Sequence, residues 1–175
     1  MAVGCYPGSF NPPTIAHLAV AEAARRHAGL DRVDLVLSVA ALGKSSTDGP
    51  TVDHRRSVLQ AVARSRPWLG VVVTDARLIA DIAAGYDAVV LGADKWAQVL
   101  DPAWYGGSLS ARDDALARLP RVLVAPRSGD HPEGVELLDV STALHTVSAS
   151  AVRAGHPDAA SWALPEAVAS GLWPG

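Results

Sequence analysis

The sequence has very little cysteine and no excess of positive charge. Cys5 is the single cysteine in 175 residues, which excludes an internal disulfide and any cysteine-cluster metal site. Lys and Arg number 15 against 18 Asp and Glu, so the net charge is −3 and no basic surface argues for a nucleic-acid partner. We expect Cys5 to be a small buried hydrophobic residue of the first strand.

Long apolar runs and metal-ligand spacings are also missing. No apolar run reaches membrane-spanning length, and the chain starts in a strand without a signal-peptide pattern, so we expect a cytoplasmic protein with no membrane partner. The six histidines show no H-x-x-x-H spacing and no close pairing with Asp or Glu. We therefore expect no metal ion held by the protein itself.

Strand-like and helix-like stretches alternate along the chain. With 49% hydrophobic and 19% charged residues, a chain of this length predicts one globular domain, residues 1–175. Apolar runs predict buried parallel strands at 2–6, 33–39, 71–75, 87–91, 121–125 and 135–140. Helices are predicted between them at 18–28, 51–65, 78–84, from 95 onward and at 112–118. This order favours an α/β fold, with a doubly wound parallel sheet and helices on both faces.

The stretch at residues 8–17, Gly-Ser-Phe-Asn-Pro-Pro-Thr-Ile-Ala-His, lies between the first strand and the first helix. Gly8 allows a close backbone approach to a ligand, and the paired prolines hold the loop extended. Thr14 and His17 are three residues apart and share one face of the incoming helix turn, where a helix N-terminus favours an anion. The plain alternative is an ordinary loop with a capping threonine.

A second candidate anion site is formed by residues 147–153, Val-Ser-Ala-Ser-Ala-Val-Arg. Ser148 and Ser150 bring two hydroxyls to a helix start, and Arg153 lies on the same face as Ser150. A serine-capped helix with a surface arginine is the alternative. Between the two motifs, Lys44 is either a solvated lysine or a cation over polyphosphate. Arg55 makes either a structural salt bridge or a ligand contact.

Residues 8–17 resemble the signature of the HxGH-type nucleotidylyltransferases, G-[ST]-F-[DN]-P-x-[HT]-x-G-H, with Ala16 in place of the usual glycine. The resemblance implies a Rossmann-like fold and a nucleoside triphosphate held by this loop. The residues that it assigns to the triphosphate and its transfer are Thr14, His17, Lys44 and Arg153. Those that it assigns to nucleotide binding are Gly8, Ser9, Phe10, Gly92, Asp94, Ser148 and Ser150.

Over nearly the whole chain the resemblance is to nicotinate/nicotinamide mononucleotide adenylyltransferases. It implies that Trp104 and Tyr105 stack on the acceptor's pyridine ring and that Arg127 reaches the acceptor's phosphate. Three features differ from that family. Thr14 stands where the family mostly has His, the approach to Lys44 is Ala-Leu-Gly, and the segment between Asp75 and Asp87 lacks a Tyr-Thr-x-x-Thr stretch.

The family's reaction is direct attack of an acceptor oxygen on the α-phosphorus of a triphosphate, with release of pyrophosphate. By resemblance, we expect ATP as substrate and Mg²⁺ carried with it. The alternatives are a pantetheine-phosphate adenylyltransferase, a cytidylyltransferase acting on another phosphorylated acceptor, and a nucleotide-binding relative in which Ala16 has weakened catalysis. The oligomeric state is left open, a homo-oligomer included.

Overall fold

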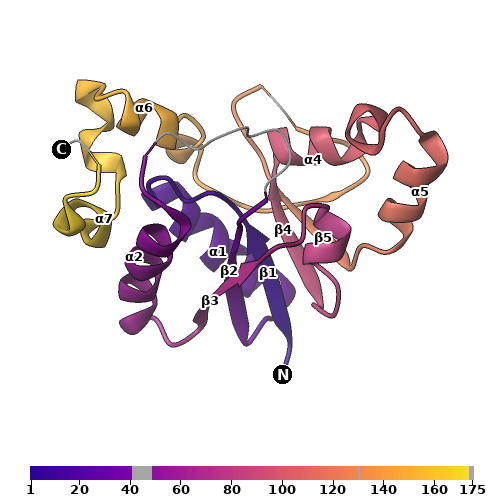
Figure 1. Cartoon of the computed structure of the whole chain (residues 1–175), viewed down its shortest axis with the longest axis horizontal. Helices are drawn as coiled ribbons and strands as arrows, with labels where there is room; N and C mark the ends of the chain where they lie inside the picture. Colours follow the sequence, from indigo (N-terminus) through magenta and orange to yellow (C-terminus); the bar gives the residue numbers. More distant parts are fainter. Residues whose placement is uncertain (41–48, 130, 174–175) are drawn as a thin grey trace.

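The computed structural model describes residues 1–40, 49–129 and 131–173 (Figure 1). The strands are β1 (Val3–Pro7), β2 (Arg32–Ser38), β3 (Leu69–Thr74), β4 (Ala88–Gly92), β5 (Arg121–Ala125) and β6 (Glu136–Leu137). The α-helices are α1 (Ile15–Ala28), α2 (Val52–Arg64), α3 (Ile79–Ile82), α4 (Ala93–Leu100), α5 (Leu109–Ala117), α6 (Ala149–Arg153) and α7 (Pro165–Ser170). Short 3-10 helices cover Pro102–Tyr105, Thr142–Leu144 and Pro157–Trp162.

The strands of the described residues form one parallel sheet in the order β3-β2-β1-β4-β5-β6. The chain first winds outward from β1 to β3 and then crosses back to place β4 on the other side of β1. The direction in which successive strands are added to the sheet therefore reverses between β1 and β4. In open α/β sheets, ligands bind outside the carboxyl ends of the strands at such a reversal.

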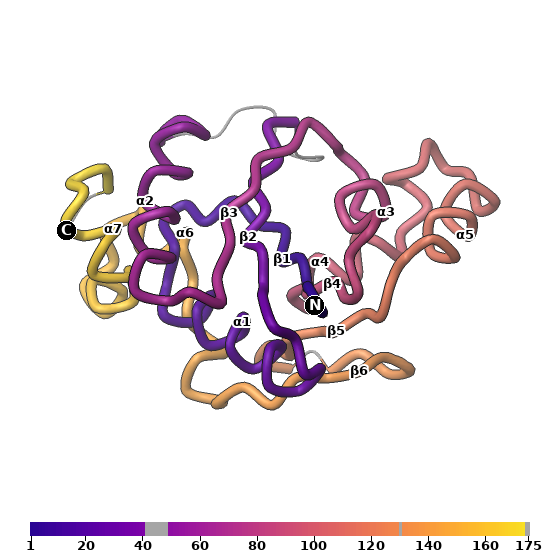
Figure 2. Tube along the Cα trace, turned by 90° about the horizontal axis from the view of Figure 1, so that it is seen from below, coloured from indigo at the N-terminus to yellow at the C-terminus, as the bar shows by residue number. Residues whose placement is uncertain are grey.

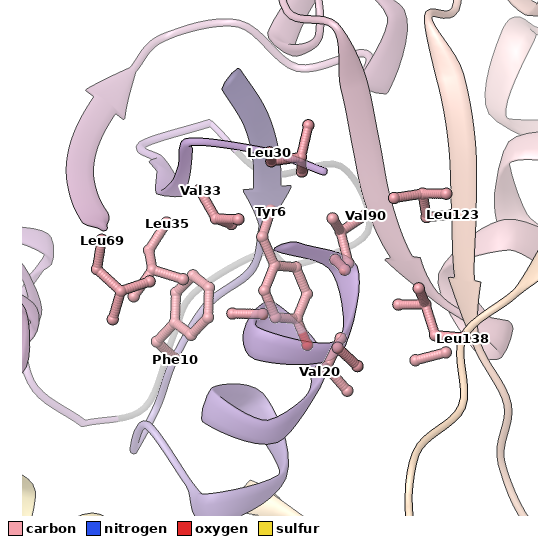
Figure 3. Packing of buried hydrophobic residues seen from close by; sticks show 14 of the residues in the cluster. Tyr6, Phe10, Val20, Leu30, Val33, Leu35, Leu69, Val90, Leu123 and Leu138 are labelled. Carbon is pink, nitrogen blue, oxygen red and sulfur yellow. The ribbon is translucent and has the colours of Figure 1, made fainter. Parts of the chain in front are cut away.

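The two faces of the sheet carry separate apolar clusters because successive strand side chains point to opposite faces. In β1, Tyr6 packs in the cluster beneath α1 and α2, whereas Cys5 packs in the cluster beneath α3 and α4. Figure 3 shows Tyr6 and Phe10 among the aliphatic side chains of the first cluster. Helices thus cover both faces of the sheet, as the sequence predicted.

The last two helices, α6 and α7, lie beside α2 and far from α5, as both views of the chain show (Figures 1 and 2).

Cys5 is fully buried, as expected, and burial raises the pKa of its thiol to about 12. No helix among the residues described is long and apolar enough to cross a membrane.

Four predicted boundaries need correction. The helix predicted from residue 95 begins at Ala93, after its N-cap Gly92, and the helix predicted at 112–118 begins at Leu109, after its N-cap Ser108. The first helix begins at Ile15 rather than near residue 18, because Thr14 caps it directly after the paired prolines. The strand predicted at 135–140 is reduced to Glu136–Leu137. Leu138 then turns into the core beside Tyr6, and the chain continues toward the 3-10 helix at Thr142–Leu144.

A buried carboxylate lies in the middle of the sheet. Asp34 is 3% exposed and accepts two hydrogen bonds from Arg32 and one from the hydroxyl of Tyr86, at 2.5 to 3.1 Å. Gly70 is its partner residue on β3. A Cβ atom at Gly70 would lie 1.9 Å from Asp34 Oδ1, so only glycine leaves room for this carboxylate. Burial and the neighbouring carboxylate raise the pKa of Tyr86.

Candidate active site

The opening motif lies where the strand order reverses. Gly8 directly follows β1, and its N–H donates to Val36 O at 3.1 Å. Gly92 is the last residue of the neighbouring strand β4. The motif at residues 8–17 and the Gly92-Ala93-Asp94 turn therefore begin at adjacent strand ends, as the predicted topology required.

A capping box fixes the start of α1. Thr14 is the N-cap residue, and its Oγ1 accepts a hydrogen bond from the backbone N–H of His17 at 3.4 Å. In return, the N–H of Thr14 donates to Nδ1 of His17 at 3.0 Å. Histidine here does what Glu or Gln does in the usual capping box. The backbone N–H of Ala16, between them, has no partner among the residues described.

This bond sets the proton position on His17. A backbone N–H can only donate, so Nδ1 is the acceptor and the proton of the neutral ring is on Nε2. Nε2 has no hydrogen-bond partner among the described residues. The ring lies 5.0 Å from Phe10 and 6.2 Å from Tyr6, centroid to centroid. Burial lowers the pKa of His17 to about 4, so at neutral pH the ring is an uncharged donor.

The lowered pKa predicts a pH dependence of stability. Between pH 6.5 and about 4 the unfolded chain protonates His17 while the folded chain does not. The unfolded state then binds more protons, so the free energy of unfolding decreases as the pH falls through this window, by up to about 3 kcal/mol. We expect urea unfolding of wild type and His17→Gln to diverge across the window, with wild type losing more. Parallel stability curves would contradict the lowered pKa.

Gly8 and Phe10 have a packing role that the sequence did not reveal. Phe10 adopts a positive φ of 45° and is 1% exposed. A Cβ atom at Gly8 would lie 2.9 Å from Cζ of Phe10, so glycine makes room for the ring. Because the Phe10 side chain is part of the core, only its backbone is left to contact a nucleotide.

Two arginines from distant parts of the chain hold the motif loop. Arg55 of α2 is 4% exposed and donates to Ser9 O at 2.7 Å and Pro50 O at 3.2 Å. It makes neither a salt bridge nor a side-chain pair in the described residues, and burial without a carboxylate lowers its pKa. Its carbonyl contacts replace the structural salt bridge offered from the sequence, and a ligand contact stays a prediction. Arg153 of α6 donates to Asn11 O at 2.5 Å.

The second motif forms as a capped helix start against the first. Ser148 caps α6 and accepts from the N–H of Ala151 at 3.3 Å. Arg153 donates to Ser150 Oγ at 3.2 Å as well as to the carbonyl of Asn11. The guanidinium of Arg153 thus joins the two candidate anion sites, although Arg153 and Asn11 are 142 residues apart in the sequence.

The residues expected to serve the acceptor lie on the other side of the reversal, along β4 and β5. Arg127 forms an ion pair with Asp94, and both side chains are exposed. Gly92, not Asp94, is the N-cap of α4, and the space in front of it is open.

Trp104 and Tyr105 lie in a 3-10 helix after α4. The Tyr105 hydroxyl donates to Val99 O at 2.9 Å, so this ring is tied to α4, whereas Trp104 is half-buried with no such bond among the described residues.

Lys44 lies outside the described residues. Within the ranges described, no group of three or more His, Cys, Asp or Glu side chains could hold a metal ion.

A cytidylyltransferase-like family model matches residues 5–155, which include both motifs and the sheet apart from the first two residues of β1. The chain belongs to this family. The prediction of a nucleotidylyltransferase superfamily member, made from residues 8–17, is thereby confirmed.

A curated relative from Salinibacter ruber, a probable nicotinate-nucleotide adenylyltransferase, is 37% identical over 67 residues. The match covers 38% of this chain and about a third of the relative's length, 34%. Two structures of a Plasmodium falciparum nicotinic acid mononucleotide adenylyltransferase, complexed with APC and with NaAD, superpose with TM-scores of 0.67 and 0.66. Each covers 97% of this chain and 93% of the solved one at 13% identity, which confirms the Rossmann-like α/β fold.

Proposed function

We propose that residues 1–175 form a nucleotidylyltransferase domain that transfers the adenylyl group of ATP to nicotinate or nicotinamide mononucleotide and releases pyrophosphate. The observation that carries the proposal is the capping box of α1. It leaves the Nε2–H of His17 without a partner among the described residues, at a helix start that Arg153 links to the second motif. The similarity to nicotinate-nucleotide adenylyltransferases supports the choice of acceptor.

In the proposed reaction, a phosphate oxygen of the acceptor attacks the α-phosphorus, and the bond from that phosphorus to pyrophosphate breaks. His17 donates its Nε2–H to a phosphoryl oxygen as negative charge develops there. Thr14 is 1% exposed, and its hydroxyl lies 3.0 Å from His17 Nδ1. Its role is therefore to orient His17, and contact with the triphosphate falls to His17 and the amides of the helix start.

Positioning supplies the rest of the catalysis. Arg153, Ser148 and Ser150 hold the β- and γ-phosphates, and Lys44 adds a cation from the loop outside the described residues. Gly8, Ser9 and the backbone of Phe10 line the nucleotide, and Gly92 gives it open space. Mg²⁺ arrives bound to the triphosphate, where it neutralises phosphate charge.

On the acceptor side, Arg127 binds the phosphate of the mononucleotide once its ion pair with Asp94 opens. Asp94 is then free to contact a ribose hydroxyl. Trp104 offers its ring face for stacking on the pyridine, with Tyr105 behind it as a fixed support. Exposed ion pairs contribute only about 0–1 kcal/mol, so the exchange of partners costs little.

A pyrophosphate-release screen tests the proposal. ATP and CTP are each combined with nicotinate mononucleotide, nicotinamide mononucleotide and phosphopantetheine. Release with ATP and a pyridine mononucleotide is the expected result. Release with CTP but not ATP rejects the adenylyl assignment. Release only with phosphopantetheine rejects a pyridine mononucleotide as the acceptor. Calorimetric ATP binding without turnover on any acceptor would indicate a binding protein instead.

Ala16 is predicted to limit the affinity for ATP. It occupies the first turn of α1 between Thr14 and His17, where its methyl group approaches a nucleotide held at the helix start. We expect Ala16→Gly to lower the KM for ATP by roughly tenfold, the lower end of the effect of one methylene in a pocket. The matched control, Ala19→Gly, carries the same helix penalty of about 0.5–1 kcal/mol without a change in KM. Equal KM values in both variants would contradict the explanation that the Ala16 methyl group crowds the nucleotide.

A further inference from the structure

Asn11, in the middle of the opening motif, is hydrogen-bonded to a tryptophan near the other end of the chain. The indole Nε1–H of Trp173 donates to Asn11 Oδ1 at 2.6 Å. Both residues are buried, Asn11 at 3% and Trp173 at 8% exposure. A buried bond of this kind is costly to break because the amide oxygen loses its donor away from water.

The same C-terminal segment contacts the next part of the loop through its backbone. The N–H of Leu164 donates to Pro13 O at 3.0 Å, and Ala163 forms an antiparallel bridge with Thr14. Residues 11, 13 and 14 are thus held from one side by residues 163–173. His17, whose Nδ1 accepts from Thr14, follows directly on this stretch.

Trp173 is itself held in place. Its ring packs in a small apolar cluster with Val58 of α2 and Ala167 of α7, and Arg66, which follows α2, is ion-paired to Glu166 of α7 at 3.1 Å. Figure 2 shows α7 against α2. The indole is therefore a rigid donor whose direction is set by two helices, and it fixes the side-chain orientation of Asn11.

We propose that Trp173 is a positioning residue for the nucleotide site: its indole N–H holds Asn11, and through it the loop that presents Thr14 and His17. The role in turnover rests on the proposed function. The physical claim, that this bond contributes to the restraint of residues 11–17 beside the contacts of Arg153, Ala163 and Leu164, does not.

Trp173→Phe tests the claim because it keeps an aromatic ring in the cluster and removes only the donor. Trp162→Phe is the matched control: it makes the same change in the same segment, and its side chain has no hydrogen bond in the described structure. Amide hydrogen exchange of Thr14 and His17, whose backbone N–H groups are hydrogen-bonded in the capping box, is read without substrate. It is expected to be at least about tenfold faster in Trp173→Phe, because loss of the bond to Asn11 allows local opening. Trp162→Phe should match wild type.

In the pyrophosphate-release assay, Trp173→Phe is expected to lower kcat by about tenfold with little change in the KM for ATP, since a displacement of about 1 Å costs up to a hundredfold. A purely structural role would lower the melting temperature and the folded fraction but leave kcat per folded molecule unchanged. Exchange rates and kcat equal to those of Trp162→Phe overturn the inference. A wild type that releases no pyrophosphate removes the proposed function instead, and the exchange data still decide the role of Trp173.

The indole N–H of Trp173 provides a second test, in wild type and in one further variant. Five tryptophans give five indole N–H resonances, and that of Trp173 should exchange far more slowly with solvent than that of Trp162. Asn11→Asp keeps an acceptor oxygen and should preserve the slow exchange. Rapid exchange of the Trp173 indole in the unmodified protein would contradict the bond and the inference with it.

Discussion

His17→Ala is expected to lower turnover by two to three orders of magnitude, because removal of one donor to a developing phosphoryl charge costs about 10²–10³ in kcat. The donor is the Nε2–H, which the bond from the Thr14 N–H to Nδ1 keeps protonated in the neutral ring. Steady-state pyrophosphate release with ATP and the best acceptor measures the effect. Equal release by wild type and variant would contradict the proposed mechanism.

His17 also caps α1, so the catalytic effect must be separated from a loss of stability. Alanine removes the acceptor for the Thr14 N–H, and loss of a cap of this kind typically costs about 1 kcal/mol. His17→Gln provides the control, because glutamine at this position is a normal capping-box residue. We expect His17→Gln to melt close to wild type and still lose most of its turnover. Full activity in this variant would show that turnover does not require the imidazole of His17.

Gly70→Ala is expected to destabilise the fold by at least about 3 kcal/mol, the upper end of typical overpacking costs. The added Cβ would lie 1.9 Å from Asp34 Oδ1 and 2.7 Å from Arg32 Nε, so the carboxylate or the strand must move. For a protein of this size the expected loss is about 6–12 °C in melting temperature. Thermal unfolding followed by circular dichroism measures it.

Gly92→Ala is the matched control for this substitution. Gly92 is likewise a strand residue, the last of β4, and its Cβ would meet nothing within 4 Å. Its melting temperature should fall much less than that of Gly70→Ala. The double variant Gly70→Ala/Asp34→Ala removes the clashing oxygen and should recover part of the loss. A Gly70→Ala protein as stable as Gly92→Ala would show that the carboxylate moves aside freely.

The sequence was enough to predict the parallel sheet, because continuous apolar runs separated by helices leave few alternatives. It also placed Thr14, His17 and Ser148 at helix starts, since capping residues act over three or four positions. These are local signals. The early start of α1 was missed because the paired prolines and the β-branched Thr14 and Ile15 have low helix propensity, which the cap at Thr14 overrides.

The contacts that shape the site are long-range, and no local pattern encodes them. Asn11 and Trp173 are 162 residues apart, and Arg55 reaches Ser9 from 46 residues away. The need for glycine at position 8 became clear only when the ring of Phe10 was seen beside it. The ion pair between Asp94 and Arg127 joins two residues predicted for separate tasks, and only the register of β4 with β5 brings them together.

The contacts that hold residues 8–17 have a consequence for the synthesis of the chain. Residues 8–17 leave the ribosome well before the groups between Arg153 and Trp173 that help to hold them. At about 5–20 residues per second, a growing chain spends roughly ten seconds or more with this loop held by Arg55 but not yet by its later contacts. A chain cut short before Arg153 would keep the sheet and lack part of the restraint on residues 8–17.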